Sequence, residues 1–375
     1  MTRVIQNEEG QVKISLFVLI FLFTIFANES QATPSYARNL KVSCTQCHSL
    51  FPNLNKYGRN FKEELAAKLK QDVADTFQAI SNPLSARIKL RPYDKSTDQD
   101  KPSQRAFHEA EIMLTGRTSK LFYMAEIEAE DETPRADGFG FDTYISHAYA
   151  GFNINRFFNV ITGFANPLTQ DTLGTVDHSE VMRGAWKATE FMPGRSQFVG
   201  FAGYAGNLTY LASFYGDAYE EGTALPSNGP EGKDPRNYTG RLSYKVMGQN
   251  IGVLYAKENG GDTKRFAVDG LIEYGSLTTR LVYAVKDEKT AAALRDKNHD
   301  ISLEAYYALG DFTPMLGLDK YTTGDGRNSY TNGQFALFYN IEDNMRVDVN
   351  YETKISVAQN EANTGRLTLR GEFAF

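Results

Sequence analysis

The chain of 375 residues has only two cysteines, Cys44 and Cys47, so no third thiol is present to exchange with this pair. After residue 27 there is no second long apolar run, which excludes a helical membrane protein. Positive charge is not in excess, because the net charge is −6, and this argues against nucleic acid as a partner. No convincing Ser-His-Asp or Cys-His constellation is present either, so hydrolysis is unsupported.

The two cysteines belong to the pentapeptide Cys44-Thr45-Gln46-Cys47-His48, whose spacing is typical of covalent c-type haem attachment. Each thiol is expected to form a thioether with a haem vinyl group, and His48 is expected to bind the iron as its proximal ligand. A thioredoxin-type dithiol needs a βαβ setting, which this stretch lacks. A structural zinc site needs four ligands, and the next candidate is as distant as His108. The motif therefore predicts one haem c.

An apolar run from Ile14 to Ala27 is followed by small residues at the end of Asn28–Ala32. This pattern predicts an export signal over residues 1–32. A transmembrane anchor is the alternative, but the run is shorter than the roughly 20 residues that a hydrocarbon core requires. Export agrees with the haem motif, because c-type attachment takes place outside the cytoplasm.

After Ser85 the sequence shows repeated segments of about ten alternating residues, rich in Tyr and Phe. In the segment 345–352, the apolar Val347, Val349 and Tyr351 share one face and polar residues share the other. The last segment, Leu367–Phe375, also alternates, and it resembles the closing strand of bacterial outer-membrane barrels. A soluble β-domain is the alternative. The pattern predicts a mainly β fold, a transmembrane antiparallel β-barrel over residues 83–375.

Short and long connections alternate along this region, as they do in outer-membrane barrels, where the short turns are periplasmic. The short connections fall at Gly116–Ser119, Asn153–Arg156, Gly206–Asn207, Gly248, Gly275, Gly310–Asp311 and Glu342–Asp343. The spacing predicts about sixteen strands, and an even number places both ends of the barrel in the periplasm. A strand pair or an inward-folded loop within Asn166–Gly194 would change the count by two.

Residues 33–82 form a small α-helical haem segment between the export signal and the barrel. An apolar stripe at helical spacing runs through it and consists of Leu54, Tyr57, Phe61, Leu65 and Leu69. The stripe predicts a helix that covers the haem, packs on the barrel, or does both. From Ser49 to Phe107 there is neither histidine nor methionine, so this segment cannot supply a sixth iron ligand of its own. Either the iron is five-coordinate or the barrel provides that ligand.

Strand parity predicts three candidates for the sixth ligand, Met113, Met124 and His147, which face the lumen from three successive strands at middle to periplasmic height. The haem would then lie at or inside the barrel mouth, with its segment as a plug. A lone inward Met or His is also common as plain lining. His178 falls in a long loop and is a weaker candidate.

An acidic run climbs the predicted lumen wall toward the outside and consists of Glu126, Glu128, Glu130, Asp131 and Glu132. Carboxylates at a pore mouth concentrate divalent cations and offer hard oxygen ligands to iron. The alternative interpretation is a solvated barrel rim.

Three stretches together, Pro34–Arg38, the haem pentapeptide and Phe51–Phe61, resemble the fused monohaem cytochrome-porin family of iron-oxidising bacteria. The barrel resembles porins only in pattern. The resemblance implies an outer-membrane protein that takes electrons from extracellular Fe(II) and passes them through one haem to a periplasmic cytochrome. It carries over Cys44 and Cys47 as thioether attachments and His48 as axial ligand, and it does not identify the sixth ligand.

Three hypotheses follow from the sequence. The first is an electron conduit in the outer membrane that acts as an Fe(II)-oxidising oxidoreductase of the iron:cytochrome c type. The second is a diffusion porin in which the haem segment gates or anchors the pore. The third is a haem peroxidase or ligand sensor, which requires an open iron position.

Overall fold

The computed structural model describes most of the chain from residue 84 to residue 374, together with a short stretch around the haem motif. The described residues are 42–43, 46–50, 53–58, 84–96, 103–117, 120–130, 142–167, 193–216, 237–247, 249–258, 262–289, 295–324, 329–342, 345–356 and 365–374. The predicted export signal, Cys44, Asp131, Glu132 and His178 lie outside these residues.

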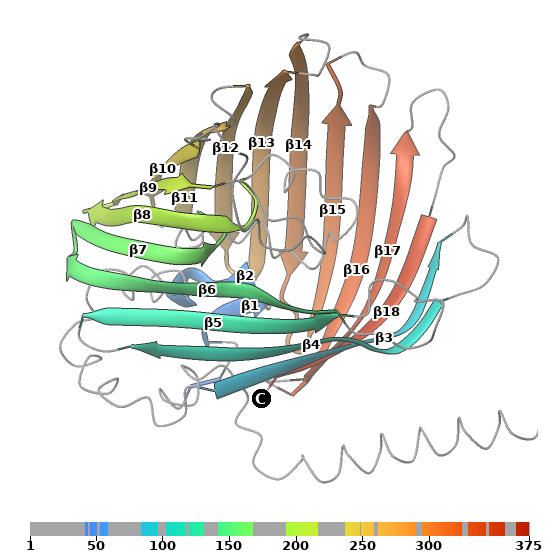
Figure 1. Ribbon diagram of the computed structural model, residues 1–375. Coiled ribbons are helices and arrows are strands. Elements are labelled where there is room, and N and C mark those ends of the chain that lie inside the picture. Colours follow the sequence, from blue (N-terminus) through green and yellow to red (C-terminus); the bar gives the residue numbers. More distant parts are fainter. Residues whose placement is uncertain are drawn as a thin grey trace, which may run out of the picture.

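Within the described residues, sixteen antiparallel strands close into a barrel, as the spacing of the connections predicts (Figure 1). Each strand pairs with its neighbours in the chain, and the last strand pairs with the first. The strands are β3 (Leu84–Ser96), β4 (Ser103–Arg117), β5 (Leu121–Glu130), β6 (Asp142–Asn155), β7 (Phe158–Ala165), β8 (Ser196–Ala205), β9 (Leu208–Tyr215), β10 (Asn237–Val246), β11 (Gln249–Glu258), β12 (Thr263–Tyr274), β13 (Leu277–Lys289), β14 (Arg295–Tyr307), β15 (Phe312–Thr322), β16 (Tyr330–Glu342), β17 (Met345–Ser356) and β18 (Gly365–Ala374).

The alternation of side chains fixes which face of each strand points into the barrel. On β11, Asn250, Leu254 and Ala256 are buried, whereas Ile251 and Val253 between them are exposed. Successive side chains of a strand point to opposite faces, so the buried set lines the lumen and the exposed apolar set forms the outer belt. The outer belt is the surface that a lipid bilayer would cover.

All seven short connections predicted from the sequence join consecutive strands at one end of the barrel. Glycines at the turns 206, 275 and 310 have φ near +60°, a backbone conformation that glycine adopts without steric cost. The eight longer connections lie at the other end. In outer-membrane barrels the end with short turns is the periplasmic one. The first barrel strand, β3, begins at this end, and the last strand, β18, finishes at it.

The long connection between β7 and β8 does not add strands to the wall. Residues 159–165 of β7 pair directly with residues 196–202 of β8, so the barrel contains no strand pair inserted between them. Whether this connection folds inward concerns residues 168–192, which lie outside the described part of the chain.

Figure 1 shows β4–β8 running across the view and β12–β17 running upright. The two groups belong to opposite walls, because about eight strands separate each member of one group from its counterpart in the other. Barrel strands tilt by about 35–45° from the axis, so strands on opposite walls cross steeply.

The haem motif precedes a small hairpin of β1 (His48–Leu50) and β2 (Asn53–Leu54), which Figure 1 draws behind β5 and β6 and within the outline of the barrel. Leu54 therefore lies in a strand, and the helical residues begin at Lys56, so the first residue of the predicted helical stripe is not helical. The reason is local: Asn55 Oδ1 accepts a hydrogen bond from Gly58 N (2.9 Å) and caps the helical residues 56–58. Phe61, Leu65 and Leu69 lie outside the described residues. Among the residues that the structure describes, no helix is long and apolar enough to span a membrane.

Candidate functional site

One side of the lumen is lined by charged residues in register, and we call the inward faces of β3, β4, β5, β17 and β18 the charged wall. Lys89 pairs with Glu109, and Glu109 pairs in turn with Glu130. The next row toward the short turns joins Arg87, Glu111 and Glu128. Residues directly opposite each other in an antiparallel pair lie on the same face, so these rows are continuous across three strands.

Basic residues of β3 neutralise the carboxylates of β4. The Arg87 guanidinium donates two hydrogen bonds to the buried Glu111 carboxylate. The Lys89 ammonium lies 2.7 Å from Glu109 Oε1 and 3.1 Å from Glu111 Oε1. Arg87 also approaches Glu372 of β18 at 3.6 Å. A buried carboxylate is tolerated only when it is paired and hydrogen-bonded, and this part of the wall meets that requirement.

The carboxylates of β5 have weaker counter-charges. Glu126, Glu128 and Glu130 are all buried and face the lumen, as the alternation predicts. Glu128 Oε2 lies 3.8 Å from the Arg195 guanidinium, and Glu130 accepts a hydrogen bond of 3.2 Å from the Tyr144 hydroxyl. The β5 side of the charged wall is therefore richer in negative charge than the β3 side.

Two sets of donor atoms on this wall are close enough to share one cation. In each set the ligand atoms all lie within 4.8 Å of one another. The sets are His108, Glu109 and Glu130, and Glu109, Glu111 and Glu128. Oxygen and imidazole donors of this kind suit a divalent first-row metal ion.

His147 and Ser146 occupy a β-bulge in the pairing of β5 with β6. Glu126 pairs with His147 but Ile127 pairs with Ile145, so Ser146 is the extra residue. Both Ser146 and His147 are buried toward the lumen. The imidazole Nδ1 lies 2.8 Å from Ser146 Oγ and 3.6 Å from Glu126 Oε2. Bulges re-aim side chains near functional sites, and this one sets His147 against a carboxylate.

The two candidate methionines also face the lumen, in adjacent rows near the short turns. Met113 pairs with Glu126, which pairs with His147, so these three form one row. Met124 lies in the next row and pairs with Tyr149 of β6. The Tyr149 hydroxyl donates a hydrogen bond to Met124 Sδ (3.4 Å). The structure thus brings Met113, Met124 and His147 together, while their role as iron ligands stays a prediction.

His108 is a lumen residue that sequence parity misses. An irregular pairing of β3 with β4 beside Glu109 leaves both His108 and Glu109 buried, although neighbours on a regular strand point to opposite faces. The Arg91 guanidinium forms a hydrogen bond with His108 Nε2. The same nitrogen lies 3.6 Å from Glu130 Oε1.

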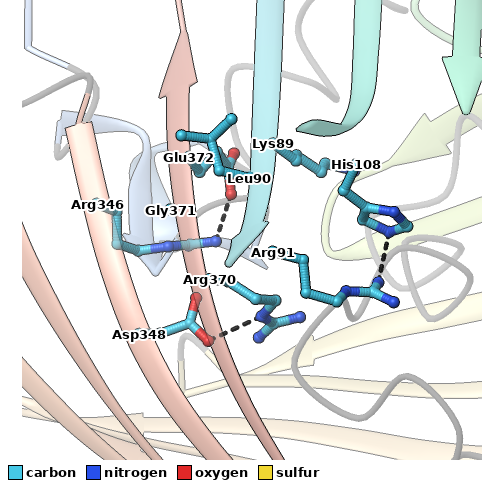
Figure 2. A pocket seen from close by; sticks show the side chains of 9 residues that line it. All are labelled: Lys89, Leu90, Arg91, His108, Arg346, Asp348, Arg370, Gly371 and Glu372. Carbon is cyan, nitrogen blue, oxygen red and sulfur yellow. Dashed lines mark hydrogen bonds and ion pairs between the residues drawn. The ribbon is translucent and has the colours of Figure 1, made fainter. Parts of the chain in front are cut away.

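Figure 2 shows His108 and Arg91 at the edge of a cavity of about 20 Å³ between β3, β17 and β18. Arg346 reaches Glu372 across this space, and Arg370 Nε donates to Asp348 Oδ1 at 2.8 Å. The cavity has room for about one water molecule. This corner of the charged wall is thus a closed set of ion pairs that ties β17 and β18 to β3.

The neighbouring part of the lumen differs in kind, and we call the inward faces of β7, β8 and β9 the uncharged wall. None of the residues of these three strands is charged. Their buried inward side chains include Ile161, Phe198, Leu211 and Tyr215, which belong to one apolar cluster. An apolar lining of this kind differs from the interior of an aqueous pore, which is polar.

The described part of the haem motif has a defined backbone. Gln46 N donates a hydrogen bond to Ser43 O (3.1 Å). Asn55 then holds the following residues, because its main-chain N donates to Cys47 O (2.9 Å) and its side chain donates to Gln46 O (3.1 Å). The Cys47 side chain is half-buried, and His48 opens β1. A half-buried thiol on a fixed turn fits covalent haem attachment, whereas Cys44 itself lies outside the described residues.

Comparison with solved structures shows the fold. OmpF of Salmonella typhi, in a complex with daunomycin, matches with a TM-score of 0.59 and 13% identity, over 78% of this chain and 97% of the other. A loop-deletion form of OmpT, an outer membrane protein of Vibrio cholerae, matches with a TM-score of 0.54 and 11% identity, over 78% and 98%. A further porin matches with a TM-score of 0.52 and 14% identity, over 78% and 99%. No protein-family model matches the chain, and no curated protein matches it significantly. The chain therefore has a porin-like barrel fold.

Proposed function

We propose that the chain is an outer-membrane electron conduit that oxidises extracellular Fe(II) and passes the electrons through a single c-type haem to a periplasmic carrier. One observation carries the proposal: a complete haem-attachment motif, Cys44 to His48, precedes a porin-like barrel whose lumen has a carboxylate wall. A pore alone needs no redox group, and a soluble cytochrome needs no barrel. The resemblance of the N-terminal stretch to fused cytochrome-porins supports the same conclusion.

The charged wall supports a route for Fe(II). Glu130, Glu128 and Glu126 descend β5 from the end with long loops toward the row of Met113 and His147. A cleft lined with one sign of charge raises the local concentration of the opposite ion. Carboxylate oxygens, with His108 beside them, are donors that Fe(II) accepts without the tight cage that would retain it.

The redox step balances with one electron per metal ion. Each Fe(II) ion loses one electron and leaves as Fe(III), and a haem supplies the site that accepts this electron. A one-electron carrier in the periplasm then removes it. The carboxylates of the charged wall hold the cation near the haem, and no proton needs to move.

Stopped-flow spectroscopy of the purified full-length holoprotein mixed with Fe(II) tests the proposal. We expect the bands of reduced haem to develop during the mixing experiment. A holoprotein that stays oxidised in excess Fe(II) but is reduced by dithionite would overturn the proposal. Replacement of both Cys44 and Cys47 by Ser is the control for the cofactor, because it removes both thioether bonds and should abolish the covalent haem stain on a denaturing gel.

A diffusion channel is the second candidate, and the porin-like fold favours it. Liposome swelling with small neutral sugars separates the two. Swelling as fast as with an open porin, together with no reduction by Fe(II), would support the channel.

A further inference from the structure

A cluster of buried apolar side chains extends around the lumen side of the barrel from β5 to β16. We call its part on β5–β9, beside the charged wall, the apolar shelf, and its side chains are Phe122, Tyr149, Ile161, Phe198, Leu211 and Tyr215. All except Tyr149, which packs against the others while partly buried, are at most 6% exposed. The lumen of a water-filled porin is lined by polar residues, so an apolar surface that continues over five strands needs another explanation.

Glycines leave two inward positions of the shelf without a side chain. Gly151 and Gly163 stand in register with Ile161 and Phe198, at inward positions where a side chain would otherwise rise from the sheet. A Cβ at Gly151 would lie 1.9 Å from Phe122 Cζ, so the Phe122 ring occupies that space. Rings that lie along a sheet over glycines form a surface suited to a planar apolar group.

Met124 lies at the edge of the shelf. It follows Phe122 on the same face of β5, and its register partner is Tyr149. The hydrogen bond of 3.4 Å from the Tyr149 hydroxyl fixes the thioether on the lumen side. Hydrogen bonds of this kind orient the ligands of a metal and tune its properties.

The haem-bearing segment meets the barrel close to Met124. β3 begins at Leu84, which pairs with Leu114, and Leu114 pairs with Ala125. The chain therefore joins the wall in the row next to Met124 and two strands away, which is about 10 Å at the usual strand spacing.

We propose that Met124 is the sixth ligand of the haem iron and that the apolar shelf covers the porphyrin; this inference rests on the proposed function. Of the three candidates, Met124 alone has a shelf residue as its register partner. Met113 pairs with the buried carboxylate of Glu126, and His147 Nδ1 faces Ser146 and the same carboxylate. A thioether also raises the reduction potential relative to two histidines, as an acceptor for Fe(II) requires.

Three variants of the full-length holoprotein test the assignment: Met124→Leu, Met113→Leu and His147→Gln. The first readout is the near-infrared charge-transfer band that ferric haem shows with a thioether ligand. The second is carbon monoxide binding to the reduced protein. We expect Met124→Leu to lose the band and to bind carbon monoxide at least tenfold more tightly. Met113→Leu, the matched control with the same substitution, should retain the wild-type spectrum, and so should His147→Gln.

The inference is overturned if the wild type lacks the band, if Met124→Leu retains it, or if either other variant loses it. Tyr149→Phe covers the case in which Met124→Leu does not fold, because it keeps the ring and removes only the hydrogen bond to Sδ. It should shift the band, and an unchanged band would also contradict the assignment. Fe(II) reduction measured on the same wild-type sample separates a wrong ligand from a wrong function.

Discussion

The charged wall and the uncharged wall line neighbouring parts of one lumen, with only β6 between them, yet they are built from different amino acids. On β3–β5, β17 and β18, arginines and carboxylates alternate in register, and the acidic members outweigh the basic ones on β5. On β7–β9 there is no charged residue at all. A cation moving through the lumen is attracted to one wall only, while the other wall is dry enough to cover a planar apolar group.

The two walls are also stabilised in different ways. Each ion of the charged wall depends on a partner across the sheet, so the loss of one member leaves a buried charge behind. The uncharged wall depends on close packing over glycines, so there an added atom is more damaging than a lost one. We therefore expect substitutions in the charged wall to destabilise the barrel by leaving an unpaired charge, and substitutions in the uncharged wall to destabilise it by adding atoms to a closely packed surface.

The largest effect should come from the charged wall. Glu111→Gln removes the carboxylate that both Arg87 and Lys89 contact. Because two cations then stay buried with too little counter-charge, we expect the free energy of unfolding to fall by about 3 to 5 kcal/mol. Unfolding by urea in lipid vesicles, followed by circular dichroism, measures it.

The matched control is an ion pair outside the lumen. Lys289 and Asp262 are 3.8 Å apart and about half exposed. Lys289→Gln should change the free energy of unfolding by less than about 1 kcal/mol. Equal losses for the two variants would contradict the view that the charged wall is a buried network.

The uncharged wall should respond to a single added methyl group. Gly163 has φ +147°, and a Cβ there would lie 2.2 Å from Ala148 O. Gly163→Ala should lower the free energy of unfolding by about 1 to 3 kcal/mol. Gly240→Ala is the control, since its Cβ would lie 3.8 Å from Leu211 O, and it should stay within about 1 kcal/mol of the wild type. If both variants behave alike, close packing over Gly163 does not matter.

The difference in charge between the walls should be visible in transport and in the redox rate. The triple variant Glu126→Gln, Glu128→Gln and Glu130→Gln should lower the second-order rate of haem reduction by Fe(II) about tenfold, equivalent to about 1.4 kcal/mol. The remaining rate should depend less on ionic strength, because the steering charges are gone. Reversal potentials in planar bilayers should show reduced cation selectivity at the same time.

Glu342→Gln provides the comparison for this experiment, because it removes an exposed carboxylate at the end of β16, beside a short turn. It should leave rate and selectivity near their wild-type values. A triple variant that reacts as fast as Glu342→Gln would show that Fe(II) does not use the charged wall.

The sequence predicts the barrel well, because a side-chain period of two and the alternation of short and long connections are local signals. The inward direction of Glu126, Glu128 and Glu130 follows from the same parity. Ser146 and His108 do not follow from it, since each lies at an irregular pairing that reverses the parity of one residue. Nothing in the local sequence marks where a bulge falls.

The two walls were harder to predict than the strands. The absence of charge from residues 158–165, 196–205 and 208–215 is plain in the sequence, but an uncharged strand suits a lipid-covered or a tightly packed sheet equally well. Only the register shows that Phe198 and Tyr215 pair with each other on the inside. The proposal that Met124 binds the haem iron depends on this register as well, because its neighbour Tyr149 is 25 positions away in the chain.

The junction of β18 with β3 has a consequence for biogenesis. Arg366 holds Asp94 with two hydrogen bonds across 272 positions of sequence. Fifteen of the sixteen strand pairings join strands that are consecutive in the chain, but this last seam joins the earliest barrel strand to the latest. Until that seam forms, two unpaired edges stay open to other chains. Because this pairing has by far the largest sequence separation, we expect closure to be the last step of assembly.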